Sequence, residues 1–434
     1  MKSTRARFTG TRSRRSLALL TASLCTAACS SEDGETNHGD YGKVGGAHNA
    51  TGGQLSVGGA GTGGVISGGS STGGAFTGGT DAGGAASGGA FTGGSTTGGA
   101  ATGGQGAGGT ASGGASSGGS GGGATCTGPQ PGTRGQNPLL PNIFTADPAA
   151  LVHDCTFYIT AGRDQGTTGF DLREWYVLSS QDMVTWSDNG GPVMKLSTFS
   201  WANANAWAGQ MVERNGKFYW YVPVNERGGG MAIGVAVADS PLGPFTDALG
   251  KPLVNDAIEM AAFGYDDPGQ TAYTIDPTVF IDDDGKAYLL YGGFWRLVIV
   301  PLNEDMISFA GNMVESTPPG FFEAPDLVKR NGVYYLTYAA GSNPASIDYV
   351  TATSPTGPWR SRARILDPLP KLAGQDEPTS HPSLAEFQGQ WYLVYHLSNG
   401  PGGGTYRRQV AVEKLTFNAD GTIQKVTPTS GISF

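Results

Sequence analysis

The chain has 434 residues, of which 73 are glycine, and its formal net charge is −9. This acidic balance, with no basic cluster in the C-terminal two thirds, argues against nucleic acid as a partner. Glycine is concentrated in the N-terminal third, so residues 136–434 carry the apolar side chains that one large domain with a buried core requires.

Residues 1–29 predict an export signal. Six basic residues precede a short apolar run, Leu17 to Leu24, which is too short to span a bilayer. The segment ends at Thr26-Ala-Ala-Cys29, which resembles the lipobox of bacterial lipoproteins, although Thr26 stands where those proteins prefer leucine. We therefore expect a signal peptide of the lipoprotein type, with lipidation of Cys29 and attachment to the outer membrane. Ordinary cleavage after Ala28, which would release an extracellular protein, is the alternative.

Residues 30–135 form a predicted tether. From about residue 44 to 125 the chain is almost wholly Gly, Ala, Ser and Thr, which supply no side chains for a core. Collagen is excluded because the glycines keep no strict triplet with proline. A random chain of ~80 residues has a span of about 50 Å. We expect a disordered linker that holds a domain clear of a cell envelope.

Two cysteines remain once the signal segment is set aside. Cys25 and Cys29 belong to that segment, whereas Cys126 and Cys155 would lie in the exported part of the chain, where a disulfide is permitted. We predict that Cys126 and Cys155 pair; two free thiols are the alternative. No spacing of Cys and His resembles a zinc site.

A frame that recurs five times indicates the fold of residues 136–434. A Pro or Gly anchor is followed, ten or eleven residues later, by a tyrosine in a short apolar strand. The anchors are Pro148, Gly209, Pro277, Pro325 and Pro382, and the tyrosines are Tyr158, Tyr219, Tyr288, Tyr335 and Tyr392. In four copies a pair ending in glycine, such as Asn215-Gly216, announces a hairpin. Since the tyrosines are 47 to 69 residues apart, each unit has room for about four strands, and we predict an all-β, five-bladed β-propeller.

Acidic residues beside the anchors are the candidate catalytic groups, because the inner strands of a propeller converge on its axis. Asp147 and Asp276 directly precede their prolines, and Glu323 stands two residues before Pro325. Burying charges without partners is costly, so three carboxylates at the axis indicate a functional site. Glycosidic hydrolysis uses two such groups, one protonated to release the leaving group and one ionised to activate water.

Each of these residues also has a structural interpretation. An Asp before Pro can cap a turn, but two such pairs at matching positions, with a Glu in a third blade, favour catalysis. His381 alone is more readily a structural histidine than a metal ligand. The run Asp282-Asp-Asp-Gly285 lacks the spacing of a calcium loop and predicts a hairpin turn.

Aromatic residues near the anchors are candidate sugar-stacking groups, because an aromatic plane complements the C–H face of a sugar. We expect this role of Trp207 and Phe322, and with less support of Trp201 and Trp295; placement in the core is the alternative for all four.

The motifs around the anchors resemble glycoside hydrolase family 43, five-bladed propeller enzymes that act on arabinose and xylose polymers. The resemblance covers the whole predicted domain. It rests on Ile275-Asp-Pro-Thr-Val-Phe-Ile-Asp-Asp-Asp-Gly285, Phe322-Glu-Ala-Pro325 and Ser380-His-Pro-Ser383, with outer-strand phrases such as Ser354-Pro-Thr-Gly-Pro-Trp359. One departure is Gly209, where relatives commonly carry proline.

The resemblance implies a role for each site residue. Asp147 would be the general base, Glu323 the general acid, and Asp276 the residue that raises the pKa of the acid and orients it. Because the family inverts anomeric configuration, the carboxyl groups of Asp147 and Glu323 are expected roughly 6.5 to 9.5 Å apart. Arg408 matches an arginine that reaches the sugar, with Arg407 as the alternative. His381 matches a histidine that in many members touches a calcium ion or its waters.

We therefore expect an inverting glycoside hydrolase that releases α-L-arabinofuranosyl residues from arabinoxylan or arabinan of the plant cell wall. It would need no cofactor for the chemistry; the resemblance allows a structural calcium in the central channel. β-Xylosidase is the alternative on the same fold, since the choice between the two pentoses depends on loops such as 195–208 and 256–273. A non-catalytic carbohydrate-binding propeller is the alternative of another class, but it would repeat its polar residues blade by blade, whereas this chain repeats only its frame.

Overall fold

The computed structural model describes residues 126, 128–166, 168–271 and 273–434. The predicted signal peptide with Cys29, and the predicted tether up to residue 125, lie outside these residues. Within the described part of the chain, no helix is both long and apolar enough to cross a membrane.

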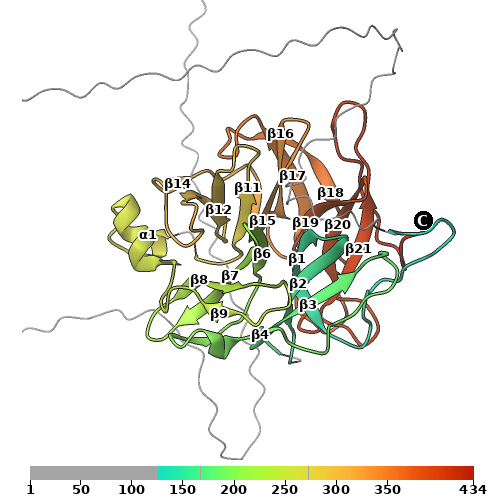
Figure 1. Ribbon diagram of the computed structural model, residues 1–434, viewed down its shortest axis with the longest axis horizontal. Helices are drawn as coiled ribbons and strands as arrows, with labels where there is room; N and C mark the ends of the chain where they lie inside the picture. The colour runs from blue at the N-terminus through green and yellow to red at the C-terminus, as the bar shows by residue number, and fades with distance from the viewer. Residues whose placement is uncertain (1–125, 127, 167, 272) are drawn as a thin grey trace, which may run out of the picture. The chain divides into compact units, whose positions relative to one another are not determined.

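Five antiparallel sheets follow one another along the described residues (Figure 1). The first sheet comprises β1 (Thr145–His153), β2 (Thr156–Arg163), β3 (Glu174–Ser180) and β4 (Met194–Lys195). The second comprises β5 (Ala202–Ala204), β6 (Gln210–Arg214), β7 (Lys217–Glu226), β8 (Met231–Ala238), β9 (Thr246–Asp247) and β10 (Val254–Asn255).

The remaining three sheets complete the set. The third comprises β11 (Thr278–Ile281), β12 (Ala287–Tyr291), β13 (Val298–Leu302) and β14 (Val314–Glu315). The fourth comprises β15 (Phe321–Arg330), β16 (Val333–Ala340), β17 (Ser346–Ala352) and β18 (Arg360–Leu366). The fifth comprises β19 (Ser383–Phe387), β20 (Gln390–Leu397) and β21 (Gln409–Leu415).

The sheets are arranged as blades around an axis, which confirms the predicted five-bladed β-propeller. The inner strands β1, β6, β11, β15 and β19 gather in the middle of Figure 1, each in contact with the next, and β19 contacts β1. A hydrogen bond also joins each pair of neighbouring blades. These bonds run from Thr160 Oγ1 to the Gly209 carbonyl, from Val279 N to Gln210, from Ala324 N to Asp276, from Leu384 N to Asp326, and from Ala150 N to Ser383 Oγ.

The apolar core lies between the blades, because neighbouring residues of a strand point to opposite faces of its sheet. On β7, Trp220 packs in the cluster shared with the first blade, whereas Tyr221 packs in the cluster shared with the third. On β2 and β20, Phe157 and Tyr392 meet in the cluster between the first and fifth blades. The recurring aromatic residues thus bury the faces of adjacent blades against each other.

The turns that link the first two strands of the blades use left-handed backbone. Asn215 and Gly216 have φ angles of 54° and 75°, which suit a tight hairpin turn. In the first blade, where glycine is missing, Asp154 and Cys155 adopt φ angles of 43° and 59°. As expected, the run Asp282-Asp-Asp-Gly285 forms the turn between β11 and β12.

The ends of the described chain close the ring. Gly132 N donates to the Phe434 carbonyl at 2.7 Å, and Leu139 N donates to the Val410 carbonyl at 2.9 Å. Cys126 and Cys155 form a disulfide that links this N-terminal segment to the β1–β2 turn. The folded part therefore begins before residue 136, the boundary expected from composition, because residues from Gly132 onward already bond to the C-terminal end of the chain.

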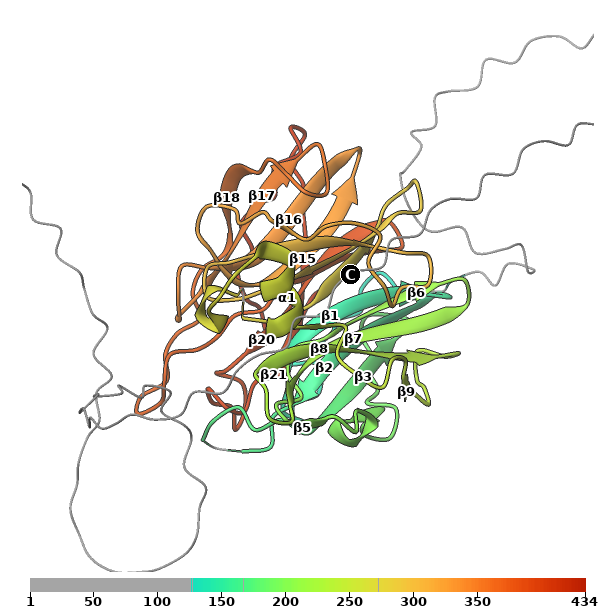
Figure 2. The same ribbon diagram turned by 90° about the vertical axis from the view of Figure 1, so that its left-hand side faces the viewer.

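The second blade carries an extension that composition did not predict. After β10 the chain forms α1 (Asp256–Phe263), on the outside of the propeller and facing the viewer in Figure 2. Asn255 caps α1 by accepting a hydrogen bond from Ile258 N, and Gly264, with φ of 71°, ends it. Two short 3-10 turns, η1 (Leu196–Thr198) and η2 (Pro268–Gln270), lie in the two loops expected to shape the pocket.

Candidate active site

A cavity of about 180 Å³ opens on the axis, where the inner strands begin. Its walls bring together all the residues that the sequence placed there: Asp147, Trp207, Asp276, Phe322, Glu323, His381 and Arg408. They are joined by Phe170, Ala208, Tyr273, Ile275, Phe294, Asn343 and Thr379. Residues from all five blades therefore line one pocket, which carries three acidic side chains and one arginine.

An unusual backbone conformation aims the acidic side chains. Asp147, Asp276 and Ala324, which each precede an anchor proline, have φ angles of 53°, 52° and 58°. The pairing of β1 with β2 and of β15 with β16 shifts register at these positions, as a β-bulge does. Non-glycine residues in left-handed backbone cost energy and cluster at functional sites. Because Glu323 precedes the bulged Ala324, it enters the pocket one position earlier than the two aspartates.

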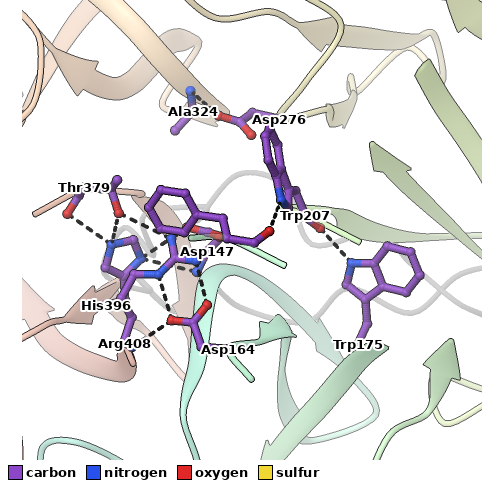
Figure 3. Close-up of polar contacts among 10 residues, drawn as sticks. Asp147, Asp164, Trp175, Trp207, Asp276, Ala324, Thr379, His396 and Arg408 are labelled. Carbon is purple, nitrogen blue, oxygen red and sulfur yellow. Dashed lines mark hydrogen bonds and ion pairs between the residues drawn. The ribbon is translucent and has the colours of Figure 1, made fainter. Parts of the chain in front are cut away.

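Arg408 holds Asp147 in place (Figure 3). Its Nη1 donates to Asp147 Oδ1 at 2.6 Å and to Thr379 Oγ1 at 3.3 Å. Its Nε and Nη2 donate to the two oxygens of Asp164 at 2.9 and 2.8 Å. Burial opposes the charge of Arg408, but Asp147 and Asp164 outweigh it and raise the pKa of the guanidinium above its ordinary value. Arg408 is the residue that reaches the pocket; Arg407 lies against the ring of Phe144.

His396 fixes the backbone of Asp147. The Asp147 N–H donates to His396 Nδ1 at 3.2 Å, so Nδ1 is an acceptor, and Nε2 carries the proton toward the carbonyl of Thr379 at 3.1 Å. Burial first, then the charge of Arg408, lowers the pKa of His396 well below its ordinary value. The contact of 3.4 Å between Nδ1 and Asp147 Oδ1 is therefore not an ion pair, because the ring is neutral.

Two of the three acidic side chains in the pocket bind protons readily. Burial, followed by the nearby charge of Asp147, raises the pKa of Glu323 to about 8, although Arg408 acts against this. Burial, Glu323 and Asp147 raise the pKa of Asp276 as well. Asp276 Oδ2 also accepts a hydrogen bond of 3.1 Å from Ala324 N, the residue that follows Glu323. Asp276 thus fixes the backbone beside Glu323.

The aromatic candidates divide between pocket and core. Trp207 lines the pocket and donates from Nε1 to the Phe170 carbonyl at 2.8 Å. Phe322 also lines the pocket and packs against Trp295, with 5.4 Å between ring centroids. Trp295 is 55% exposed beside the pocket mouth. Trp201 packs against the core between the first two blades, where its Nε1 donates to Asp247.

Several residues in or behind the pocket wall lie outside the recurring frame and were missed. Asp164 and His396 stand at or just beyond the end of the second strand of their blades, and Phe294 and Asn343 follow the second strands β12 and β16. In an antiparallel hairpin the end of the second strand lies beside the start of the first, where the anchors are. Polar residues at the ends of the tyrosine-bearing strands were the signal that could have found them.

Among the described residues, the surroundings of His381 supply no cluster of three acidic, His or Cys side chains for a metal. Burial lowers the pKa of His381 to about 4, so its ring is neutral near pH 7. Calcium prefers six to eight oxygen ligands, and within residues 126–434 as described no group of three acidic, His or Cys side chains could hold a metal. A calcium ion held at His381 through water stays a prediction, and no chemical step is assigned to it.

Known proteins resemble this chain in sequence and architecture. The family model for Glycosyl hydrolases family 43 matches residues 135–423. An arabinoxylan arabinofuranohydrolase of Bacillus subtilis (strain 168) is 34% identical over 339 residues, covering 67% of this chain and 64% of that relative. A β-D-galactofuranosidase of Aspergillus niger is 33% identical over 317 residues, covering 68% of this chain and 86% of that relative.

A solved structure extends the likeness to the fold. It is a β-xylosidase/α-arabinofuranosidase from a compost microbial metagenome in complex with xylotriose, in a calcium-free form, at 33% identity and a TM-score of 0.59. The likeness covers 68% of this chain and 98% of that one. The chain belongs to glycosyl hydrolase family 43, and it is a glycoside hydrolase with a five-bladed β-propeller fold.

Proposed function

We propose that this protein is an inverting exo-glycosidase that releases single α-L-arabinofuranosyl residues from arabinoxylan or arabinan. The observation that carries the proposal is the unequal environment of two carboxyl groups in one pocket. Asp147 is paired with a guanidinium at 2.6 Å, whereas Glu323 has a pKa raised to about 8 by burial and by Asp147. Two carboxyl groups whose environments differ in this way serve as base and acid in glycoside hydrolysis.

In the proposed reaction, Asp147 accepts a proton from a water molecule as the water oxygen bonds to the anomeric carbon. The bond from that carbon to the leaving-group oxygen breaks, and Glu323 gives its proton to this oxygen. Water enters opposite the leaving group, so the configuration inverts, and we expect the two carboxyl groups roughly 6.5 to 9.5 Å apart. Asp276 orients Glu323 through Ala324 N and, when ionised, favours the protonated acid.

The size of the pocket supports removal of one sugar at a time. Its volume of about 180 Å³ is below the roughly 300 to 1,000 Å³ of sites that enclose drug-sized ligands. Trp207 and Phe322 offer aromatic rings to a bound sugar, and Arg408, His381 and Asn343 offer polar groups for hydroxyls.

An exposed aromatic surface beside the mouth supports a polymeric substrate. We call Tyr273, Phe294 and Trp295 the rim aromatics; they are 39%, 48% and 55% exposed. All three have left-handed backbone, with φ angles of 50°, 49° and 71°, which is costly for such residues. Trp295 Nε1 donates to the Gly341 carbonyl at 2.8 Å, which fixes its ring. We expect this surface to contact the part of the polysaccharide that leaves.

β-Xylosidase activity is the second candidate, because the compost relative is named for both activities. The direct test is hydrolysis of para-nitrophenyl α-L-arabinofuranoside beside para-nitrophenyl β-D-xylopyranoside, with Glu323→Gln and Asp147→Asn as controls. Arabinofuranoside turnover that both substitutions abolish supports the proposal, and turnover of the xyloside alone moves it to β-xylosidase. Failure to hydrolyse either, with binding of oligosaccharides retained, would favour the carbohydrate-binding alternative.

The rim aromatics are tested by comparing substrates. Trp295→Ala should lower kcat/KM more on arabinoxylan oligosaccharides than on the small para-nitrophenyl arabinoside, since stacking on a sugar face contributes most where a sugar backbone is present. An equal loss of kcat/KM on both substrates would show that the rim aromatics do not bind the polysaccharide. Trp201→Phe, in the core between the first two blades, controls for loss of a tryptophan.

We also propose export and attachment to the outer membrane through a lipid on Cys29, with a substrate trimmed outside the cell. The support is the sequence of residues 1–29 alone. Cell fractionation of the full-length chain beside Cys29→Ser tests this: release of the variant into the medium is expected, and equal release of both would show that no lipid holds the protein.

A further inference from the structure

Asp164 lies outside the pocket wall but beside the residue that holds the proposed base. It follows β2, its backbone N–H donates to the Phe144 carbonyl at 3.0 Å, and its side chain is 1% exposed. Because its buried side chain does not line the cavity, we expect no contact between Asp164 and a bound sugar. Asp164 can therefore affect the reaction only through its contacts with Arg408.

The contacts of Asp164 determine where the guanidinium of Arg408 points. Asp164 accepts from the Arg408 backbone N at 2.8 Å, from Nε at 2.9 Å and from Nη2 at 2.8 Å. A guanidinium is planar and its N–H groups form a rigid fork. Once Nε and Nη2 are held, the direction of Nη1 is set, and Nη1 is the atom 2.6 Å from Asp147. Phe170 covers one face, with its ring centroid 4.7 Å from the Arg408 carbon Cζ.

The charge balance depends on Asp164 as well. Arg408 serves two carboxylates, so Asp164 takes up much of the positive charge that would otherwise act on the pocket. The charge of Arg408 also acts on Asp276 and Glu323, from the third and fourth blades, and on His381, His396 and Tyr406, from its own fifth blade. Arg408 lowers the pKa of Glu323, whereas Asp147 raises it.

We propose that Asp164 is a positioning residue for hydrolysis, which aims Arg408 at Asp147 and shields the proton donor Glu323 from the charge of that arginine. The inference rests on the proposed function, in which Glu323 must be protonated to act. It does not depend on which pentose the enzyme prefers, because Asp164 is outside the pocket wall.

The test is the pH dependence of kcat/KM, on whichever para-nitrophenyl pentoside the enzyme hydrolyses. Without the charge of Asp164, Arg408 should stabilise the ionised form of Glu323 more strongly. The loss of activity at high pH should therefore begin at a lower pH. We call the high-pH side of this profile, where kcat/KM falls, the basic limb. For Asp164→Asn we expect the basic limb to lie at least about half a pH unit lower than in the wild type. We also expect kcat/KM to fall about 10- to 100-fold, as misplacement of a catalytic group does.

Two further variants separate charge from contact. Asp164→Glu keeps the charge on a longer arm, so its kcat/KM should fall while its basic limb stays at the wild-type position. Thr379→Val removes a neutral contact to the same Nη1, at 3.3 Å, and should also leave the limb in place. Thermal unfolding of each variant shows whether the protein is folded.

A folded Asp164→Asn protein whose basic limb coincides with that of the wild type overturns the inference, whatever its stability. If Asp164→Asn does not fold, Asp164→Glu decides, because a moved limb in that variant contradicts the role of the charge. Failure of the proposed function looks different, since then Glu323→Gln would retain both turnover and the basic limb of the wild-type enzyme.

Discussion

Asn343 enters the pocket with a buried side-chain oxygen that has no hydrogen-bond partner among the described residues. Leaving a buried acceptor unpaired costs roughly 1 to 3 kcal/mol, so a donor on the substrate is the expected partner. A sugar hydroxyl suits this position. Asn343→Ala should raise KM about 2- to 10-fold, the worth of one neutral hydrogen bond, with a smaller effect on kcat.

Steady-state kinetics on the arabinofuranoside measures this effect. Asn203→Ala, at an exposed position of β5, is the matched control and should keep the wild-type KM. An Asn343→Ala enzyme with unchanged KM and lower kcat would mean that Asn343 acts on the transition state or on the backbone, and not on substrate binding.

The raised pKa of Glu323 has a consequence for stability. Its folded pKa of about 8 exceeds the ordinary value of 4.5, so between these pH values the folded protein holds a proton that the unfolded chain has lost. Stability contributed by this group is present below pH 4.5 and is lost as pH rises toward about 8. Glu323→Gln should therefore raise the unfolding temperature relative to wild type, by little at pH 4.5 and by most above pH 8.

Thermal unfolding of both proteins across this pH range is the measurement. Glu386→Gln, at a half-buried position of β19 outside the pocket wall, is the matched control. A difference between wild type and Glu323→Gln that does not grow with pH would show that Glu323 is not buried as a protonated acid.

The sequence located the acidic residues of the pocket but not their support. Asp147, Asp276 and Glu323 all stand one or two residues before the anchor proline of a repeating frame, so their convergence follows from the fold. Asp164 and His396 bind Arg408 and the backbone of Asp147 from positions that do not recur in the other blades. Such contacts depend on the close approach of hairpin ends in three dimensions, which periodicity alone does not describe.

At the scale of the strand, Gly209 explains why the second blade departs from the proline of the other anchors. A Cβ atom at this position would lie 2.6 Å from the Tyr221 carbonyl oxygen and 2.6 Å from Val222 Cγ1, both on the central strand β7. Gly209→Ala should therefore destabilise the protein by about 1 to 3 kcal/mol, the usual cost of overpacking a core. Its carbonyl also accepts from Thr160 Oγ1, so the first two blades should loosen together.

Denaturant unfolding gives this free energy directly. Gly269→Ala is the matched control, because a Cβ atom there meets nothing closer than 3.4 Å. A Gly209→Ala protein as stable as the control would mean that β7 yields at little cost, and that the tight approach of the two strands is not needed for the fold.

The strands could be predicted because their pattern recurs in the sequence, whereas α1 could not be predicted because it occurs once. On each central strand, neighbouring apolar side chains point toward opposite neighbouring blades, so the pattern repeats wherever two blades must be packed together. The helix α1 occurs once, in a loop of the second blade, and its short sequence carries no repeating signal. Its start depends on the cap at Asn255 and its end on Gly264, both local features that the frame does not contain.

At the scale of the molecule, closure of the ring fixes the pocket, because each of the five blades contributes only some of its residues. No single blade contains the pocket, since the proposed base Asp147, the proposed acid Glu323 and Arg408 come from the first, fourth and fifth blades. Their relative positions depend on every junction between neighbouring inner strands, and on the closure where the chain ends meet. A change that weakens this closure at a point far from the pocket should therefore lower the free energy of unfolding and leave kcat unchanged.

The disulfide Cys126–Cys155 allows a test of this closure. The β1–β2 turn that carries Cys155 is at the opposite end of β1 from Asp147, so the substitutions lie away from the pocket. Removing a crosslink between residues 29 apart should lower the free energy of unfolding by about 3 to 4 kcal/mol, if the loss is loop-closure entropy of the unfolded chain. The double variant Cys126→Ser, Cys155→Ser should unfold at lower denaturant and keep the wild-type kcat at 25 °C.

Reduction of the wild-type protein should reproduce the unfolding midpoint of the double variant, which separates loss of the crosslink from loss of the sulfur atoms. If kcat fell together with stability, the N-terminal segment would be shaping the pocket through the hydrogen bonds of Gly132 and Leu139 to the C-terminal part of the chain. If neither changed, those backbone hydrogen bonds would suffice to close the ring, and the disulfide would only fasten the segment that precedes it.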